Sequence, residues 1–173
     1  MPYLRPLLSL EQAGRRVARH RPLRKGGRDL PDEEHYRKLE RMYASAPINA
    51  FFRPQMRVSE GEAVVTTSVR RDFFHAANAA HGAFYFKMLD DAAFFAVNSL
   101  VADVFVLTVS MNAYLLKSVS EGEIRALGRV VHRSRRLFVA ESQLVDSEGR
   151  QIARGSGTFI PSDIALSPEI GYV

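Results

Sequence analysis

Apolar residues recur at helical spacing near residue 40 and at strand spacing farther along the chain. Leu39, Met42 and Tyr43 form a stripe along one face of the first predicted helix. Acidic residues at 32–34 crowd its first turn, where they suit the positive end of the helix dipole. Pro47 disfavours helical backbone at the residue before it, so the helix is expected to end just ahead of this proline.

The longest apolar segment, Gly82–Leu100, contains no proline and no internal glycine. A helix that is apolar all round is buried on all sides, so this segment predicts the centre of the fold. Short turn sequences separate the β-rich runs around it, which suits antiparallel neighbours. One buried helix against an antiparallel sheet is an α+β architecture. The predicted strands span residues 55–59, 63–69, 104–116, 123–132, 137–146 and 151–160.

The composition is that of one soluble domain, with 173 residues of which 46% are hydrophobic and 25% charged. The chain has no cysteine, which excludes disulfides and thiolate metal sites and suits a reducing compartment. Its five histidines show no paired ligand spacing, so no metal site is expected. No apolar run reaches the ~18 residues of a membrane span, and the N-terminus lacks a secretory signal. We therefore expect a cytoplasmic protein.

Basic residues are concentrated at the N-terminus. Residues 1–30 carry eight basic and two acidic side chains, so the net charge of +5 belongs to this segment and not to the domain at residues 31–173. With its glycines and prolines, the segment is interpreted as a flexible basic arm. A contact with nucleic acid or an anionic surface, an extension from a misplaced start codon and an organellar presequence remain open.

The start of the buried helix and a carboxylate within it form a candidate site. The first N–H groups of a helix have no partner inside it, and Gly82 lets a carbonyl oxygen approach them closely, as in an oxyanion hole. Asp90 lies two turns farther along among apolar neighbours, where a carboxylate is costly to bury without a partner. It is interpreted as a base or nucleophile, with a capping, ion-paired or interface aspartate as the alternative. Asp91 points about 100° away, so only one of the two faces a given site.

The motif His81-Gly82-Ala83, with Asp90 nine residues after the histidine, resembles the HGG-x6-D pattern of the PaaI-like hotdog thioesterases. The resemblance continues through Leu107–Asn112, which is similar to the strand that follows the central helix in that family. It extends over residues 48–160. It implies a hotdog fold, in which a curved antiparallel sheet wraps a long central helix, and hydrolysis of acyl-CoA thioesters.

The resemblance also implies roles for individual residues. Asp90 would be the general base or nucleophile toward the thioester carbonyl, and the Gly82 N–H would bind the carbonyl oxygen. His81 would orient the loop and polarise the thioester, and Thr108 would position the attacking water. Hotdog sites are shared between subunits, so Asp90 and Thr108 are expected to come in part from opposite chains of a homodimer or tetramer. No cofactor is implied beyond the coenzyme A of the substrate.

The chain departs from the family pattern at two positions. Ala83 replaces the usual second glycine, which is a small change. Relatives often carry an asparagine six residues before the His-Gly pair, where this chain has His75. Either Asn78 substitutes for that asparagine or His75 takes its role, so both are candidates for catalysis. A purely structural loop histidine is the alternative.

Basic residues after the helix are candidates for binding the coenzyme A phosphates. Arg133, Arg135 and Arg136 lie in a predicted turn between two strands, and guanidinium groups match phosphate oxygens. Lys117 could serve in the same way. The alternative is a solvated hairpin tip that binds nothing.

Three alternatives to a thioesterase remain. A hotdog hydratase or dehydratase pairs a histidine with an acid at a different spacing, which this sequence lacks. An acyl-CoA-sensing regulator would need a DNA-binding segment, but residues 1–30 are too rich in glycine and proline for a helix-turn-helix, so nucleic-acid binding is not expected. An inactive hotdog binding protein is the third alternative, because the usual asparagine is missing.

Overall fold

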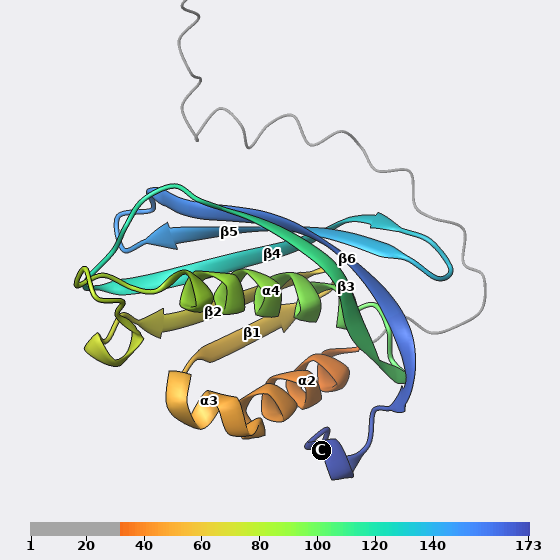
Figure 1. Ribbon diagram of the computed structural model, residues 1–173. Helices are drawn as coiled ribbons and strands as arrows, with labels where there is room; N and C mark the ends of the chain where they lie inside the picture. The colour runs from red at the N-terminus through yellow and green to blue at the C-terminus, as the bar shows by residue number, and fades with distance from the viewer. Residues whose placement is uncertain (1–31) are drawn as a thin grey trace, which may run out of the picture.

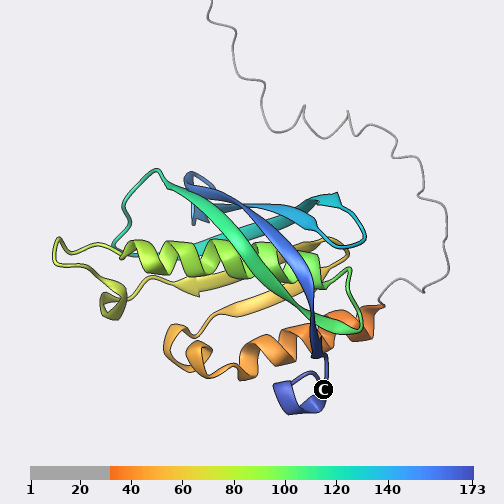
Figure 2. The ribbon, with the colours of Figure 1, turned by 45° about the vertical axis from the view of Figure 1, so that its right-hand side comes forward.

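The computed structural model describes residues 32–173, in which one curved antiparallel sheet wraps a long helix (Figure 1). The strand order is β1-β2-β4-β5-β6-β3. The helix α4 contacts every strand of the sheet, and the view in Figure 2 shows it lying along the sheet's inner face. The predicted α+β architecture is therefore confirmed. The elements are α2 (Glu33–Ser45), α3 (Pro47–Phe52), β1 (Gln55–Ser59), β2 (Glu62–Ser68), η1 (Arg71–Phe73), α4 (Gly82–Asn98), β3 (Val104–Leu115), β4 (Glu123–Arg133), β5 (Phe138–Asp146), β6 (Gln151–Ala165) and η2 (Pro168–Ile170).

Most predicted elements agree with the structure to within about two residues, and two differences have clear causes. Pro47 ends α2 as predicted, but it also occupies the first turn of the short helix α3, where its missing N–H costs nothing. The strand β6 continues five residues beyond the predicted end at residue 160. Pro161 does not stop it, because β5 pairs with β6 only as far as Phe159 and leaves Pro161 without a neighbour on that side.

The two edges of the sheet differ in how their backbone groups are used. At the β1 edge, the Arg37 guanidinium donates to the Val58 carbonyl at 2.9 Å, and the Val58 N–H donates to Glu40 at 2.8 Å. Side chains of α2 therefore cap this edge. At the β3 edge, the Asn98 side chain of α4 binds the Val104 carbonyl and the Val106 N–H at the start of the strand. The rest of β3 exposes large apolar side chains, among them Val109 at 59% and Leu115 at 51%.

The helix α4 approaches β4 so closely that only glycine fits between them. Ala92 and Ala93 are fully buried on the side of the helix that faces Gly128 of β4. A Cβ atom on Gly128 would lie 2.1 Å from the Ala92 carbonyl oxygen, which is backbone and cannot rotate away. The helix, which carries the candidate site, is thus positioned by backbone contact with the sheet.

We expect Gly128→Ala to lower the free energy of unfolding by about 3 kcal/mol, because the added methyl forces the helix away from the sheet. Urea denaturation followed by circular dichroism measures the change. Arg129→Ala, at the exposed next position of β4, is the control and should stay within about 0.5 kcal/mol of wild type. Equal denaturation midpoints for Gly128→Ala and wild type would contradict this account of the packing.

The predicted basic arm, residues 1–30, lies outside the described residues. Within residues 32–173, no helix is both long and apolar enough to cross a membrane.

Candidate active site

Asp90 lines a cavity of about 730 Å³ between α4, β3, the α2–α3 corner and the C-terminal η2. Most of its walls are apolar, and three of its four charged residues, Lys87, Asp90 and Asp91, lie on α4. The candidate carboxylate therefore borders a space that is large enough for a ligand. Its lining residues are Met42, Tyr43, Ser45–Asn49, Lys87, Asp90, Asp91, Phe94, Phe95, Phe105, Leu107, Thr108 and Pro168–Gly171.

Asp90 and Thr108 meet within a single chain. The Thr108 hydroxyl donates to Asp90 Oδ1 at 3.0 Å. The expectation that these two residues come from opposite chains is therefore wrong for this pair, because the start of β3 runs directly beside the middle of α4. Burial raises the pKa of Asp90; the Thr108 hydrogen bond lowers it, the Asp91 charge raises it further, and Lys87 lowers it. Oδ2 of Asp90 accepts no hydrogen bond from residues 32–173, so the carboxylate keeps a free oxygen for a water or a substrate.

The neighbouring Asp91 is held in place by two partners. Its Oδ2 accepts from Lys87 Nζ at 2.5 Å and from the Tyr43 hydroxyl at 2.6 Å. This ion pair satisfies Asp91 and ties α4 to α2, which leaves Asp90 as the available carboxylate. Sequence reasoning did not identify Lys87 or Tyr43 as site residues. The spacing of Lys87 and Asp91, four residues apart on a helix, was a visible signal, but the contact with Tyr43 depends on the tertiary fold.

The raised pKa of Asp90 predicts the acid limb of the activity profile. A base must be ionised, so kcat/KM should fall as the pH drops through a value above the ordinary aspartate pKa of 3.8. Thr108→Val removes the hydrogen bond that favours the carboxylate, and we expect the acid limb to move to higher pH. Rates measured across the pH range for both proteins test this, and superimposable acid limbs would exclude Asp90 as the titrating base.

His81 caps the first turn of α4. Its Nδ1 accepts the Ala83 N–H at 3.0 Å, and in the neutral ring this leaves the proton on Nε2, which can donate to a ligand. The Gly82 N–H has no acceptor among residues 32–173. Gly82 and Asp90, however, are separated by about 12 Å along the helix axis, since each residue adds about 1.5 Å. The expectation that both face one small volume therefore fails within a single chain.

His75 and Asn78 shape the loop ahead of α4. The His75 N–H donates to the Ala79 carbonyl at 2.9 Å, and the Asn78 N–H donates to the His75 carbonyl at 3.0 Å. Asn78 adopts left-handed backbone with φ of 60°, which asparagine tolerates better than most residues. The His75 ring lies 6.4 Å from the His81 ring, so His75 is close to the helix start. Both side chains are exposed.

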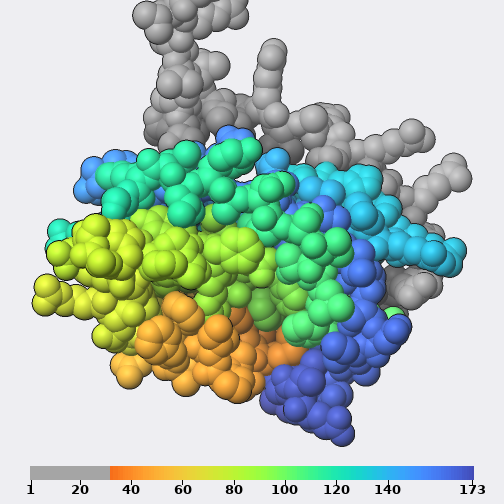
Figure 3. All heavy atoms as spheres, viewed as in Figure 1, coloured from red at the N-terminus to blue at the C-terminus, as the bar shows by residue number. Residues whose placement is uncertain are grey.

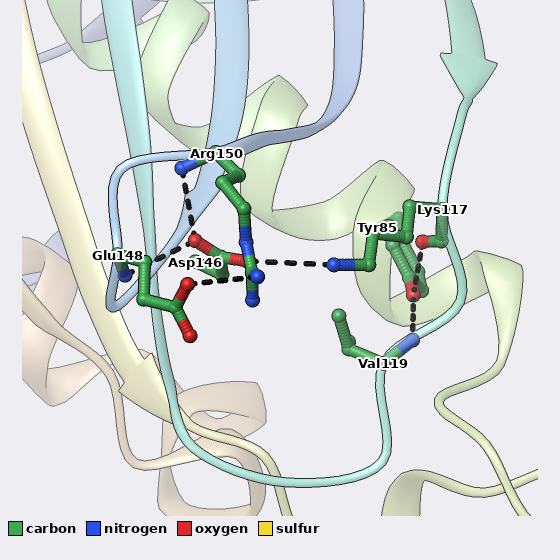
Figure 4. A network of polar contacts seen from close by, with 6 residues as sticks. All are labelled: Tyr85, Lys117, Val119, Asp146, Glu148 and Arg150. Carbon is green, nitrogen blue, oxygen red and sulfur yellow. Dashed lines mark hydrogen bonds and ion pairs between the residues drawn. The ribbon is translucent and has the colours of Figure 1, made fainter.

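The candidate phosphate-binding residues lie at opposite ends of the sheet. Lys117 follows β3 near the start of α4, where the Tyr85 hydroxyl bridges the Lys117 carbonyl and the Val119 N–H (Figure 4). Its ammonium group lies 3.8 Å from Asp146, which also binds Arg150. Arg133, Arg135 and Arg136 are exposed in the β4–β5 hairpin, beyond the other end of the helix (Figure 1). One chain does not bring Lys117 and the arginines together.

Residues 77–153 match the family model of the Thioesterase superfamily. No protein of curated function matches the sequence. The family segment contains Gly82, Asp90 and Thr108, and it ends before the last half of β6. The match supports thioesterase activity in general.

Solved structures share the fold across the described domain. The E. coli PaaI protein, from the phenylacetic acid degradation operon, has a TM-score of 0.72 at 19% identity, and the alignment covers 80% of this chain and 100% of that one. A variant of the PaaI protein of Thermus thermophilus has a TM-score of 0.62 at 25% identity, covering 68% and 100%. AziG of S. sahachiroi has a TM-score of 0.64 at 22% identity, covering 67% and 96%. The predicted hotdog fold and the resemblance to PaaI are confirmed.

Proposed function

We propose that this chain, which has the hotdog fold of PaaI and matches the Thioesterase superfamily over residues 77–153, hydrolyses acyl-CoA thioesters with Asp90 as the base or nucleophile. One observation carries the proposal. Asp90 is a half-buried carboxylate with a free oxygen, hydrogen-bonded to Thr108 on the wall of a largely apolar cavity. An acyl group fits such a cavity, and a carboxylate at its wall can reach the carbonyl carbon.

The reaction needs water, a carboxylate and an oxyanion donor. Asp90 takes a proton from water as the water oxygen attacks the thioester carbon, or its own oxygen attacks and water later hydrolyses the resulting anhydride. The carbonyl oxygen gains negative charge, which an unpartnered N–H at a helix start stabilises. In the base route the carbon–sulfur bond then breaks, and the thiol of coenzyme A leaves with the proton that Asp90 took from water. In the nucleophile route the thiolate leaves as the anhydride forms, and water then hydrolyses the anhydride to release the acid and the Asp90 carboxylate. Thr108 holds Asp90 Oδ1, which fixes the direction of the other oxygen.

The oxyanion donor is proposed to come from a second copy of the chain. About 12 Å separate Gly82 from Asp90 in one copy, which is too far for both to touch one carbonyl group. The open edge strand β3 supports pairing between copies, because the β1 edge is capped by Arg37 and Glu40. A homodimer joined at β3, or a tetramer built from such dimers, would bring Gly82 of one copy to Asp90 of the other. His81, and His75 beside it, would arrive with Gly82, while Asn78 is assigned to shaping the loop.

The coenzyme A phosphates are proposed to bind at the exposed arginines or at Lys117. Arg133, Arg135 and Arg136 are solvent-accessible and make no ion pair within residues 32–173. Lys117 is already near Asp146, so it is the weaker candidate.

The direct test is thiol release from a panel of acyl-CoA thioesters. We expect measurable hydrolysis of at least one acyl class by the purified protein. Double-bond formation or hydration without thiol release would favour a hydratase or dehydratase instead. Tight binding of acyl-CoA with no turnover of any member would favour the sensing or inactive alternatives.

A further inference from the structure

The last eight residues of the chain form one wall of the candidate active site. Residues 166–173, here called the C-terminal segment, leave β6 and fold back through η2. Pro168, Glu169, Ile170 and Gly171 line the same cavity as Asp90. Figure 3 shows the C-terminal segment, in dark blue, beside the orange surface of α2 and below the green surface of β3.

One face of α2 holds the C-terminal segment in place. His35 contacts the Tyr172 hydroxyl at 2.7 Å, and Arg41 Nε donates to the Val173 carbonyl oxygen at 2.5 Å. Lys38 lies 5.4 Å from the centre of the Tyr172 ring. These α2 residues are spaced three apart, so they share one side of the helix. These contacts hold the C-terminal segment in one position against α2, so the segment is a fixed wall of the cavity.

The backbone of the C-terminal segment also packs directly on α2. Gly171 has a φ of 85°, and a Cβ atom there would lie 2.3 Å from the Ser45 hydroxyl oxygen. His35 is anchored in turn, because its Nε2 lies 3.0 Å from the Asn98 carbonyl at the end of α4. The segment is therefore fixed to both α2 and, through His35, to the helix that carries Asp90.

We propose that the C-terminal segment sets the length of the acyl group, with Ile170 as the residue that meets the end of an apolar acyl chain. The inference rests on the proposed thioesterase function, since it assigns the acyl group to this cavity. With the thioester carbon at Asp90, the acyl chain extends among Phe94, Phe105 and Leu107. Those side chains belong to the long helix α4 and the edge strand β3, whereas Ile170 belongs to a short turn that follows the last strand. Its side chain is partly buried against the core and apolar, so it suits contact with hydrocarbon.

The experiment compares chain-length profiles for straight-chain acyl-CoA thioesters, from acetyl to palmitoyl. Ile170→Ala enlarges the cavity, and we expect kcat/KM for long chains relative to short ones to rise about tenfold. Ile170→Phe fills the cavity and should shift the profile toward shorter chains by a similar factor. Ile164→Ala is the matched control, since Ile164 is 47% exposed on β6 and lies outside the cavity.

A merely structural role for Ile170 predicts a different result. Loss of stability lowers all rates together and leaves the ratio of long to short chains unchanged, so superimposable profiles for the two Ile170 variants and wild type would overturn the inference. Two variants of opposite size keep the test valid if one fails to fold. Calorimetric binding of the same thioesters provides a second readout without turnover. If the wild type hydrolyses none of these thioesters, the proposed function is wrong. A preferred chain length for binding that differs between wild type and the Ile170 variants would still support the role of the C-terminal segment.

Discussion

Asp90→Asn should reduce kcat for thioester hydrolysis by at least ~100-fold while leaving the fold intact, because a carboxamide can neither accept the proton of water nor attack as an anion. Asparagine keeps the size of the side chain and can still accept the Thr108 hydrogen bond. Thiol release under saturating substrate measures the loss. Circular dichroism and the thermal midpoint establish that the variant is folded.

The stability of the Asp90→Asn variant adds an independent check. Because burial raises the pKa of Asp90, the folded state binds the proton more tightly than the unfolded state does. Stability from this group is fully present below the unfolded pKa and is lost as the pH rises through the folded pKa. At neutral pH the ionised carboxylate is therefore a net cost to folding, and Asp90→Asn should be as stable as wild type or more so. A loss of folding stability of this kind is expected where the reaction requires an ionised side chain in a partly buried position.

Asp91→Asn is the matched comparison, one residue away on the same helix. Asp91 is ion-paired to Lys87 and accepts from Tyr43, so its loss leaves Lys87 partly buried without its partner. We expect a lower thermal midpoint and a smaller effect on kcat than Asp90→Asn has. The reverse pattern, with Asp91→Asn inactive and Asp90→Asn active, would transfer the catalytic role to Asp91.

The fold was predictable because its signals are local. The apolar run in α4, the turn at Gly61 and the capped start of α2 each involve residues near one another in the sequence, and each determines an element within a few residues. The sequence also places the small residues Ala92 and Ala93 in this helix, but it does not predict what they pack against. Only the approach of Gly128, which lies far along the chain, explains why α4 presents alanines at that point.

The candidate site was predictable only in part, because its geometry depends on distant segments. The motif around His81 and Gly82 pointed to the helix start, and the helix pattern pointed to Asp90. The contact between Tyr43 and Asp91 and the wall at Ile170 join residues from distant parts of the chain, and no local pattern marks them. The spacing of Gly82 and Asp90 in the sequence motif also suggested that the two residues act on one carbonyl group. In a single copy, the rise of the helix separates them by about 12 Å.

Gly82→Pro should lower kcat by about 100-fold through the loss of one N–H donor. The substitution suits the backbone, since Gly82 is the first residue of α4, a position that favours proline, and His81 before it is extended. The new side chain meets Leu115, whose tip can move, because a Cβ atom at position 82 would lie 3.1 Å from its terminal carbon. Gly82→Ala makes the same contact but keeps the N–H, so it should retain most of the activity. Equal losses in both variants would show that crowding, and not the donor, is responsible.

Co-expression of Gly82→Pro and Asp90→Asn copies with different tags then tests whether the site spans two chains. In a mixed dimer, one site would receive both altered residues, while the other would receive the intact Gly82 of one copy and the intact Asp90 of the other. Random pairing should therefore restore about one quarter of the wild-type rate from two inactive parents. If both groups acted within one chain, every site would contain one altered residue and no activity would return. The helix rise of about 1.5 Å per residue makes the first result the expected one, because one carbonyl group cannot reach both Gly82 and Asp90 of the same helix.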